Sequence, residues 1–181
     1  DIAFTPAVKA AQERKGSRTI YAGMEMGETI DPNLAAFIAG VRSFYLATAS
    51  KDGQPYIQHR GGPPGFLHGV GERQLAFADF KGNRQFITTG NLAENPKAYI
   101  FLMDYAHRQR IKIWGTARVI EGDTGLEQRL MPEGYRARAE QVILFDVEAW
   151  DSNCPQHIPQ MFHADDMRQA IDERDARIAL L

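Results

Sequence analysis

Residues 75–85 decide the fold: they read Leu-Ala-Phe-Ala-Asp-Phe-Lys-Gly-Asn-Arg-Gln and run from an apolar strand directly into a polar, cationic turn. Leu75 and Phe77 alternate as the apolar residues of a half-buried strand do. The strand ends at the turn formers that surround Gly82, and Arg84 follows. A guanidinium beside a glycine turn, where backbone N–H groups are free, suits a phosphate group in charge and geometry. A hairpin loop with a solvated arginine is the alternative, and this stretch alone favours that alternative.

Length and composition predict one domain. The 181 residues are 44% hydrophobic, which is enough for one substantial core but leaves two independent cores small. The net charge of −2 and the pI of about 6.2 give no global cationic field, so we expect neither nucleic acid nor a membrane as a partner. The single cysteine, Cys154, excludes an internal disulfide and fits a reducing compartment, so we expect a cytoplasmic protein.

Helices are expected mainly at the two ends of the chain. A proline at position 6 and a glycine at position 16 frame an N-terminal helix over residues 6–14. Asp31 is a good N-cap for a second helix, and Pro32 is tolerated in its first turn. Residues 164–180 form an amphipathic helix. The expected organisation is a helical extension over residues 1–30, a central domain over residues 31–162 and a C-terminal helix over residues 163–181.

The middle of the chain reads as strands joined by tight turns. Residues 44–49 and 54–59 predict a hairpin around a turn that contains Gly53. Shorter helical segments are expected at residues 91–96 and 125–130, and further strands at residues 98–103, 110–120 and 142–149. About six strands joined by hairpins, with few helices in the crossovers, predict an α+β domain whose mainly antiparallel sheet closes into a small barrel.

Three strand ends carry polar side chains that can converge. These are residues 56–60, 79–85 and 108–110, and a glycine- and proline-rich loop at residues 61–65 allows a ligand to approach the backbone closely. Amides and backbone groups suit the edge of a flat heteroaromatic ring, and arginine suits a phosphate tail. Flavin mononucleotide (FMN) fits this combination.

Four short motifs carry a resemblance to a known family. They are Gly53-Gln54-Pro55-Tyr56, residues 77–84, Glu94-Asn95-Pro96-Lys97, and a basic strand that ends in Gly115. Their succession resembles the pyridoxamine 5'-phosphate oxidase family of FMN-binding split barrels. More narrowly, the chain is similar to a subfamily that carries Gly-Asn-Arg-Gln and a terminal Trp-Asp-x-Asn-Cys-Pro-Gln-His-Ile-Pro-Gln, here residues 150–160. The resemblance covers roughly residues 37–162.

The resemblance implies a homodimer that binds two FMN molecules in clefts between the subunits, with each site completed by the partner's C-terminal segment. The phosphate-binding basic pair of the family falls on Arg84 and Gln85, so its second member is uncharged here and Thr88 is expected to supply a hydroxyl. Arg110 takes the place of a glutamine at the flavin ring edge, near the N1–C2 carbonyl. The implied cofactor-binding residues are Gln58, His59, Arg60, Gly61, Gly62, Ala78, Asp79, Asn83, Arg84, Gln85, Thr88, Arg110, Trp150, Asn153 and Gln156.

The chain differs from the family pattern at positions that bind the substrate in the oxidases, which affects the reaction that we expect. Pro63 stands where the oxidases carry a substrate-binding lysine, and residues 154–157 replace a basic arginine-histidine pair. We therefore expect an FMN-dependent oxidoreductase with another small-molecule substrate or an electron donor such as NAD(P)H, and not pyridoxamine 5'-phosphate oxidation. A non-catalytic flavin or haem binding or storage protein is the alternative. A deazaflavin-dependent reductase would need a larger basic groove than this acidic chain offers.

Three histidines, His59, His157 and His163, also have interpretations that do not involve the flavin. Cys154, His157 and His163 supply only three potential ligands without a matching second pair, so no metal site is expected. His59 reads equally well as a surface histidine of a strand.

Overall fold

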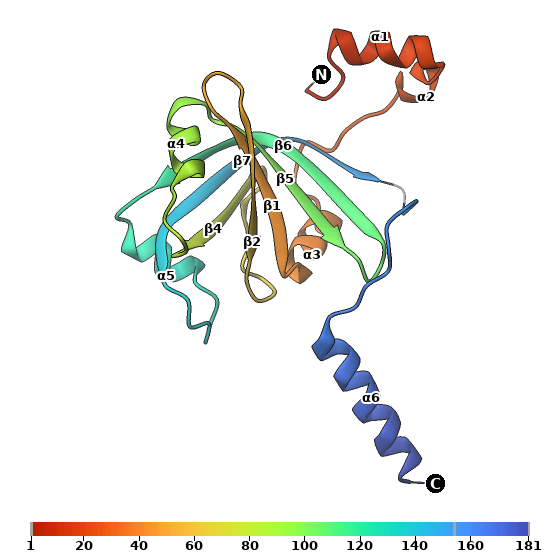
Figure 1. Ribbon diagram of the computed structural model, residues 1–181, viewed down its shortest axis with the longest axis vertical. Coiled ribbons are helices and arrows are strands. Elements are labelled where there is room, and N and C mark those ends of the chain that lie inside the picture. The colour runs from red at the N-terminus through yellow and green to blue at the C-terminus, as the bar shows by residue number, and fades with distance from the viewer. Residues whose placement is uncertain (1, 154, 181) are drawn as a thin grey trace.

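Seven strands form one antiparallel sheet that curls around the core, in a computed structural model that describes residues 2–153 and 155–180 (Figure 1). The order across the sheet is β2-β1-β5-β6-β7-β4-β3, so β2 and β3 are its two edges. The strands are β1 (Ser43–Ala49), β2 (Pro55–Gly61), β3 (His68–Gly71), β4 (Gln74–Phe80), β5 (Lys97–Asp104), β6 (Gln109–Ile120) and β7 (Ala139–Asn153).

The described part of the chain also forms six helices: α1 (Pro6–Lys15), α2 (Arg18–Tyr21), α3 (Pro32–Gly40), α4 (Ile87–Glu94), α5 (Thr124–Leu130) and α6 (Ala164–Ile178). The α1 and α6 helices extend away from the sheet at opposite ends of the molecule (Figure 1), and all of their described residues are at least partly exposed. The α3 helix begins as expected, since the Asp31 carboxylate accepts a hydrogen bond from the Leu34 N–H at 2.7 Å. None of the helices in the described part of the chain is long and apolar enough to cross a membrane.

The core fills the concave side of the sheet. Strands β1, β5 and β6 alternate buried and half-buried residues, which is the period of two expected for sheets with one face on the core. The predicted alternation in β6 is confirmed, because Ile111 and Ile113 are buried whereas Lys112 and Trp114 lie on the other face. Four fully buried phenylalanines anchor the core: Phe44, Phe66, Phe77 and Phe145.

The β4 strand is buried on both faces, which differs from the half-buried strand that its alternation predicts. Leu75 and Phe77 face the main core, whereas Ala76 and Ala78 pack in a smaller cluster with Leu130 of α5. The small alanine side chains leave room for α5 on the outer face. The strand is therefore held from both sides where it leads into the turn at residues 81–86.

Among the elements that differ from the sequence prediction, three bear on the sheet and the site. The short strand β3 was not predicted, because two of its four residues are glycines, which are depleted in strands. The β7 strand runs on to Asn153, so that Trp150 is part of the sheet. The α4 helix begins at Ile87 rather than near residue 91, since Ile87, Thr88 and Thr89 are β-branched and resemble a strand more than a helix.

Candidate functional site

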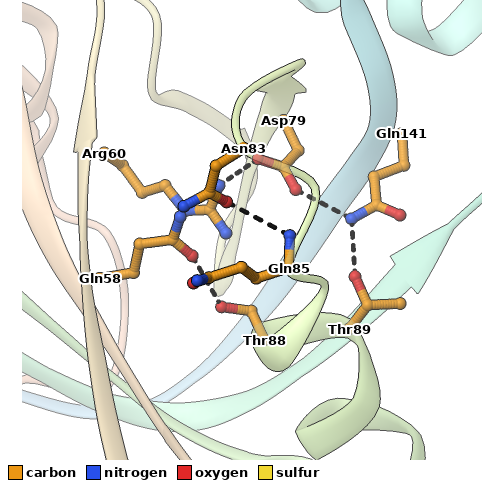
Figure 2. A network of polar contacts seen from close by, with 8 residues as sticks. All are labelled: Gln58, Arg60, Asp79, Asn83, Gln85, Thr88, Thr89 and Gln141. Carbon is orange, nitrogen blue, oxygen red and sulfur yellow. Dashed lines mark hydrogen bonds and ion pairs between the residues drawn. The ribbon is translucent and has the colours of Figure 1, made fainter.

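A small cleft, open to solvent and about 50 Å³ in volume, lies where β2 faces β4 and the start of α4. Polar side chains from four separate segments point into this region (Figure 2). We call it the phosphate cleft, after the ligand group that the sequence predicts there. Its lining residues are Tyr56, Gln58, Arg60, Asp79, Phe80, Gly82, Asn83, Arg84, Gln85, Phe86, Ile87, Thr88, Thr89 and Glu140.

The turn before α4 has an unusual backbone. Arg84 and Phe86 adopt the left-handed conformation, with φ of 59° and 54°, which is uncommon for residues other than glycine and asparagine. The Asn83 side-chain carbonyl accepts a hydrogen bond from the Gln85 N–H at 3.2 Å and so helps to fix the turn. Phe86 is the N-cap of α4, and no described side chain caps the helix there. The first turn of α4 therefore offers free N–H groups and a positive dipole end to an anion.

Arg84 is part of this turn, and its side chain lines the phosphate cleft. Its guanidinium is 5.4 Å from the centre of the Phe86 ring, and its Nε is 2.9 Å from a carboxylate oxygen of Glu140 on β7. The Arg84 side chain is 56% exposed and Glu140 is 24% exposed. The cation is thus accessible to a ligand from solution, but in this structure it is paired with an internal carboxylate.

A buried polar network forms the floor of the cleft (Figure 2). Arg60 of β2 forms an ion pair with Asp79 of β4. The Gln141 side-chain amide donates to the other Asp79 oxygen at 2.8 Å and to the Thr89 hydroxyl at 2.9 Å. Because Gln141 is only 3% exposed, its two hydrogen bonds join β4, β7 and α4 away from solvent.

Burial acts on both charges of this pair. It raises the pKa of the Asp79 carboxyl, against the opposing effects of the Arg60 guanidinium and the Gln141 hydrogen bond. Burial also lowers the pKa of Arg60, whose attraction to Asp79 acts in the other direction. The Arg60 Nε is buried and has no hydrogen-bond partner among the described residues. An unpaired buried donor is costly, so the cleft floor favours a ligand that brings an acceptor.

The start of α4 is fixed on its other side as well. The Thr88 hydroxyl donates to the Gln58 side-chain carbonyl at 3.1 Å, which joins the helix to β2 (Figure 2). One turn later, the Asn91 amide donates to the Thr48 hydroxyl at 3.0 Å and joins it to β1. The N–H groups of the first turn are therefore held in place before any ligand arrives.

Arg110 and Trp150 line a different cleft of the chain, beside the start of α3. The Arg110 Nε is buried without a partner within residues 2–153 and 155–180. The Trp150 indole N–H donates to the Thr29 carbonyl at 2.8 Å, and its ring lies against Gly27, where a Cβ would approach within 2.3 Å. One chain by itself therefore does not bring these two residues to the phosphate cleft.

Other predicted site residues lie outside the phosphate cleft too. His59 alternates with the inward-facing Gln58 and Arg60, so it lies on the opposite face of β2, with its ring 5.6 Å from that of Tyr45. Ala78 packs toward α5 on the outer face of β4.

The remaining predictions fall at chain positions that the cleft does not include. Gly61 ends β2, and Gly62 follows it, close to the Phe66 ring. Gln156 is exposed after β7. The Asn153 backbone pairs with Arg110, and Cys154 lies outside the described residues.

Three residues of the site were missed by the sequence analysis: Thr89, Glu140 and Gln141. The available signal was the polar pair Glu140-Gln141 directly before the apolar run at residues 142–145. A buried strand that begins with two polar residues places them at the rim of a sheet, where ligand sites are common.

A curled antiparallel sheet with a pre-formed anion cleft at its open side defines a split-barrel domain of the pyridoxamine 5'-phosphate oxidase type, which is an FMN-binding fold. Residues 30–154 match the sequence model described as Pyridoxamine 5'-phosphate oxidase. The chain therefore belongs to this family, whose members commonly bind FMN. The predicted fold class and family are confirmed, whereas the narrower subfamily remains a prediction.

Solved structures show the same fold at low sequence identity. HupZ from Group A Streptococcus is 18% identical, with a TM-score of 0.56 over 74% of this chain and 99% of that chain. A putative pyridoxamine 5'-phosphate oxidase from Lactobacillus delbrueckii is 16% identical, with a TM-score of 0.54 over 71% and 99%. An FMN-binding protein from Syntrophomonas wolfei is 14% identical, with a TM-score of 0.51 over 80% and 97%. No curated protein matches the chain by sequence.

Replacing Asp79 by asparagine should reveal the cost of its buried charge. Burial raises the pKa of Asp79, so the folded protein favours the protonated carboxyl. The stability that this preference contributes is fully present below the unfolded pKa of about 3.9. It is lost as the pH rises through the folded pKa and the carboxyl ionises. Asparagine mimics the protonated acid. The free energy of unfolding of Asp79→Asn, relative to wild type, should therefore increase between about pH 4 and about pH 7.

Urea denaturation at several pH values measures this difference, with the same substitution at Asp172, exposed on α6, as the control for the change itself. A relative stability that decreases with pH would mean that the attraction of Arg60 outweighs desolvation.

Proposed function

We propose that the chain binds FMN with the flavin phosphate in the phosphate cleft and acts as a flavin-dependent oxidoreductase. The observation that carries the proposal is the start of α4, where no described side chain caps the helix and Arg84 lies beside the free N–H groups. Family membership supports FMN as the ligand, because the family commonly binds it. Pyridoxamine 5'-phosphate oxidation is not proposed, since Pro63 stands at the position of the substrate lysine.

The residues of the cleft fit a phosphate with a polyol chain attached. The first-turn N–H groups of α4 and the Arg84 guanidinium are donors for the phosphate oxygens. The buried Arg60 Nε is a donor in need of an acceptor on the cleft floor. Gln58 uses its carbonyl to accept from Thr88, which leaves its amide N–H groups for a ligand hydroxyl. The cleft thus offers a donor set that matches the anionic and polar half of FMN.

When bound, FMN supplies electron transfer at its isoalloxazine ring. The contribution of the chain is to bind the phosphate, to orient the flavin and to set the charge around it. Arg110 is the residue proposed to lie at the ring edge, where a cation stabilises negative charge on the reduced ring. Its unpaired buried Nε supports this role, because a carbonyl of the ligand would satisfy it.

We further propose that two copies share each flavin site. Arg110 and Trp150 line one cleft of the chain and the phosphate-binding residues line another, so a site that uses both sets needs a second copy. The resemblance to the oxidases supports this arrangement, since those proteins complete each site with the partner's C-terminal segment. The occupied Trp150 indole N–H means that this residue would contact the flavin through its ring and not through a hydrogen bond.

An aromatic outer face on the convex side of the sheet supports the dimer. Tyr45, Tyr99, Phe101 and Trp114 alternate with core residues of β1, β5 and β6 and are half-buried. The Tyr99 ring is 5.2 Å from Trp114 and 6.4 Å from Phe101, and burial raises the pKa of Tyr99 to about 12. A half-buried aromatic cluster on the outer face of a sheet is typical of protein interfaces.

FMN binding is the first test. The purified protein should take up FMN and show a flavin absorption band, and Arg84→Ala should weaken FMN binding by about 1.5–3 kcal/mol, the scale of a lost hydrogen bond to a charged group. Arg118→Ala is the matched control, because Arg118 is exposed and pairs with Asp146 outside the cleft. A protein that does not take up FMN would refute the proposed function. If Arg84→Ala binds FMN as tightly as wild type, the flavin phosphate does not bind at Arg84.

Redox activity is tested with the FMN-loaded protein under anaerobic conditions. Stepwise addition of NADH or NADPH should bleach the flavin absorption band, and admission of oxygen should restore it. A bound flavin that stays oxidised with both donors, but is reduced by dithionite, would favour the binding or storage alternative over an oxidoreductase that uses these donors.

A charge on the aromatic outer face should separate the dimer. Phe101→Arg places a guanidinium within this face and should give a monomer with reduced FMN affinity, measured by light scattering after gel filtration and by FMN titration. Val70→Arg is the control, because Val70 is an exposed apolar residue that lies away from this face, on the edge strand β3. A monomeric Phe101→Arg that binds FMN as tightly as wild type would contradict the shared site.

A further inference from the structure

Glu140 occupies a position in the phosphate cleft that a ligand anion would be expected to take. Its carboxylate oxygen is 2.9 Å from the Arg84 Nε, and it lines the same cleft as the start of α4. Glu140 is the less exposed of the two partners, since its side chain is 24% exposed whereas that of Arg84 is 56% exposed. The guanidinium that suits a phosphate is therefore already satisfied by the chain itself.

The charges of the cleft are balanced in pairs. Arg60 faces Asp79 on the floor, and Arg84 faces Glu140 at the rim, so two guanidinium groups meet two carboxylates. Glu140 is also close enough to Asp79 for its charge to raise the pKa of that carboxyl. A phosphate dianion that enters this cleft meets negative charge as well as donors, which is unlike a site built from unpaired basic residues.

The two pairs differ in how readily they exchange partners. Arg60 and Asp79 are almost buried, with side chains 12% and 11% exposed, and Gln141 holds Asp79 from the other side. The Arg84–Glu140 pair lies at the rim, where solvent screens the attraction and ion pairs contribute little. Arg84 can therefore leave Glu140 for a ligand at small cost, but the carboxylate remains in the cleft unless its side chain rotates toward solvent.

We propose that Glu140 is an internal competitor for Arg84, which a ligand phosphate must displace, and that it thereby sets how strongly the cleft prefers phosphorylated over unphosphorylated flavins. This inference rests on the proposed function and adds a specificity-determining residue to it. Glu140 lowers the affinity for every phosphate-bearing ligand and leaves riboflavin, which lacks the phosphate, unaffected.

The test compares wild type with Glu140→Gln, which keeps the shape of the side chain and removes its charge. Dissociation constants for FMN and riboflavin are measured by flavin fluorescence titration, and inorganic phosphate binding is measured by calorimetry. Glu140→Gln should bind FMN and inorganic phosphate about three- to fivefold more tightly and riboflavin unchanged within about twofold. Glu148→Gln is the matched control, because Glu148 lies exposed on the same strand and outside the cleft.

Each outcome decides the point. An equal gain for riboflavin and FMN, or no gain for FMN, would overturn the inference while leaving FMN binding intact. A weaker affinity for FMN would also overturn it and would make Glu140 a residue that positions Arg84. If neither protein binds FMN but Glu140→Gln gains affinity for inorganic phosphate, the competition between Glu140 and a phosphate for Arg84 is supported, whereas the flavin preference and the proposed function are both refuted. If neither protein binds FMN or phosphate, both fail.

Discussion

The structure depends on the buried ion pair between Arg60 and Asp79. The sheet order places β2 at one edge and β4 next to the other edge, so no backbone ladder joins these two strands. Arg60 and Asp79 join them through side chains, and the Arg60 guanidinium also lies 6.0 Å from the centre of the Phe77 ring. Breaking such a pair would leave a buried charge without compensation, which is why the two strands stay opposed across the open side of the barrel.

The open side of the barrel is also where the ligand cleft lies. A closed ladder between β2 and β4 would use the backbone groups there and leave no space for a ligand. Instead, α4 fills part of the opening and is held by Gln58 on one side and by Gln141 on the other. Because these hydrogen bonds reach the first turn of α4, the contacts that hold the barrel together also position the donors of the phosphate cleft. Stability and anion binding therefore depend on the same few polar side chains.

The sequence predicted much of this fold because its signals are local. Asp31 and Pro32 mark the start of α3, and alternation identifies β1, β5 and β6. The start of α4 was missed because Phe86 caps it in a left-handed conformation that no local residue pattern indicates. The double burial of β4 was missed because it depends on α5, which packs against it from about fifty residues further along the chain.

The sequence predicted several residues of the candidate site, but not the ion pairs that they form. The residues near the turn, including Asn83, Arg84 and Gln85, lie together in the cleft as expected. The alternation of β2 places His59 on the face opposite to the cleft. The family resemblance had included His59 among the cofactor-binding residues because a motif names consecutive residues, whichever face of the strand they lie on.

The pairing partners of the two arginines are long-range contacts, and their consequence concerns ligand preference. Asp79 is 19 residues from Arg60 in the chain, and Glu140 comes from a strand more distant still. A sequence motif identifies only the arginines, whereas the structure also shows the carboxylate that pairs with each of them. Because a phosphate site is defined by its net charge as well as by its donors, the two carboxylates make the affinity of this cleft for a phosphate lower than its arginines alone suggest. Ligands that place hydroxyls on the floor and a single anionic group at the rim match this distribution, since only the pair at the rim can exchange its partner at low cost.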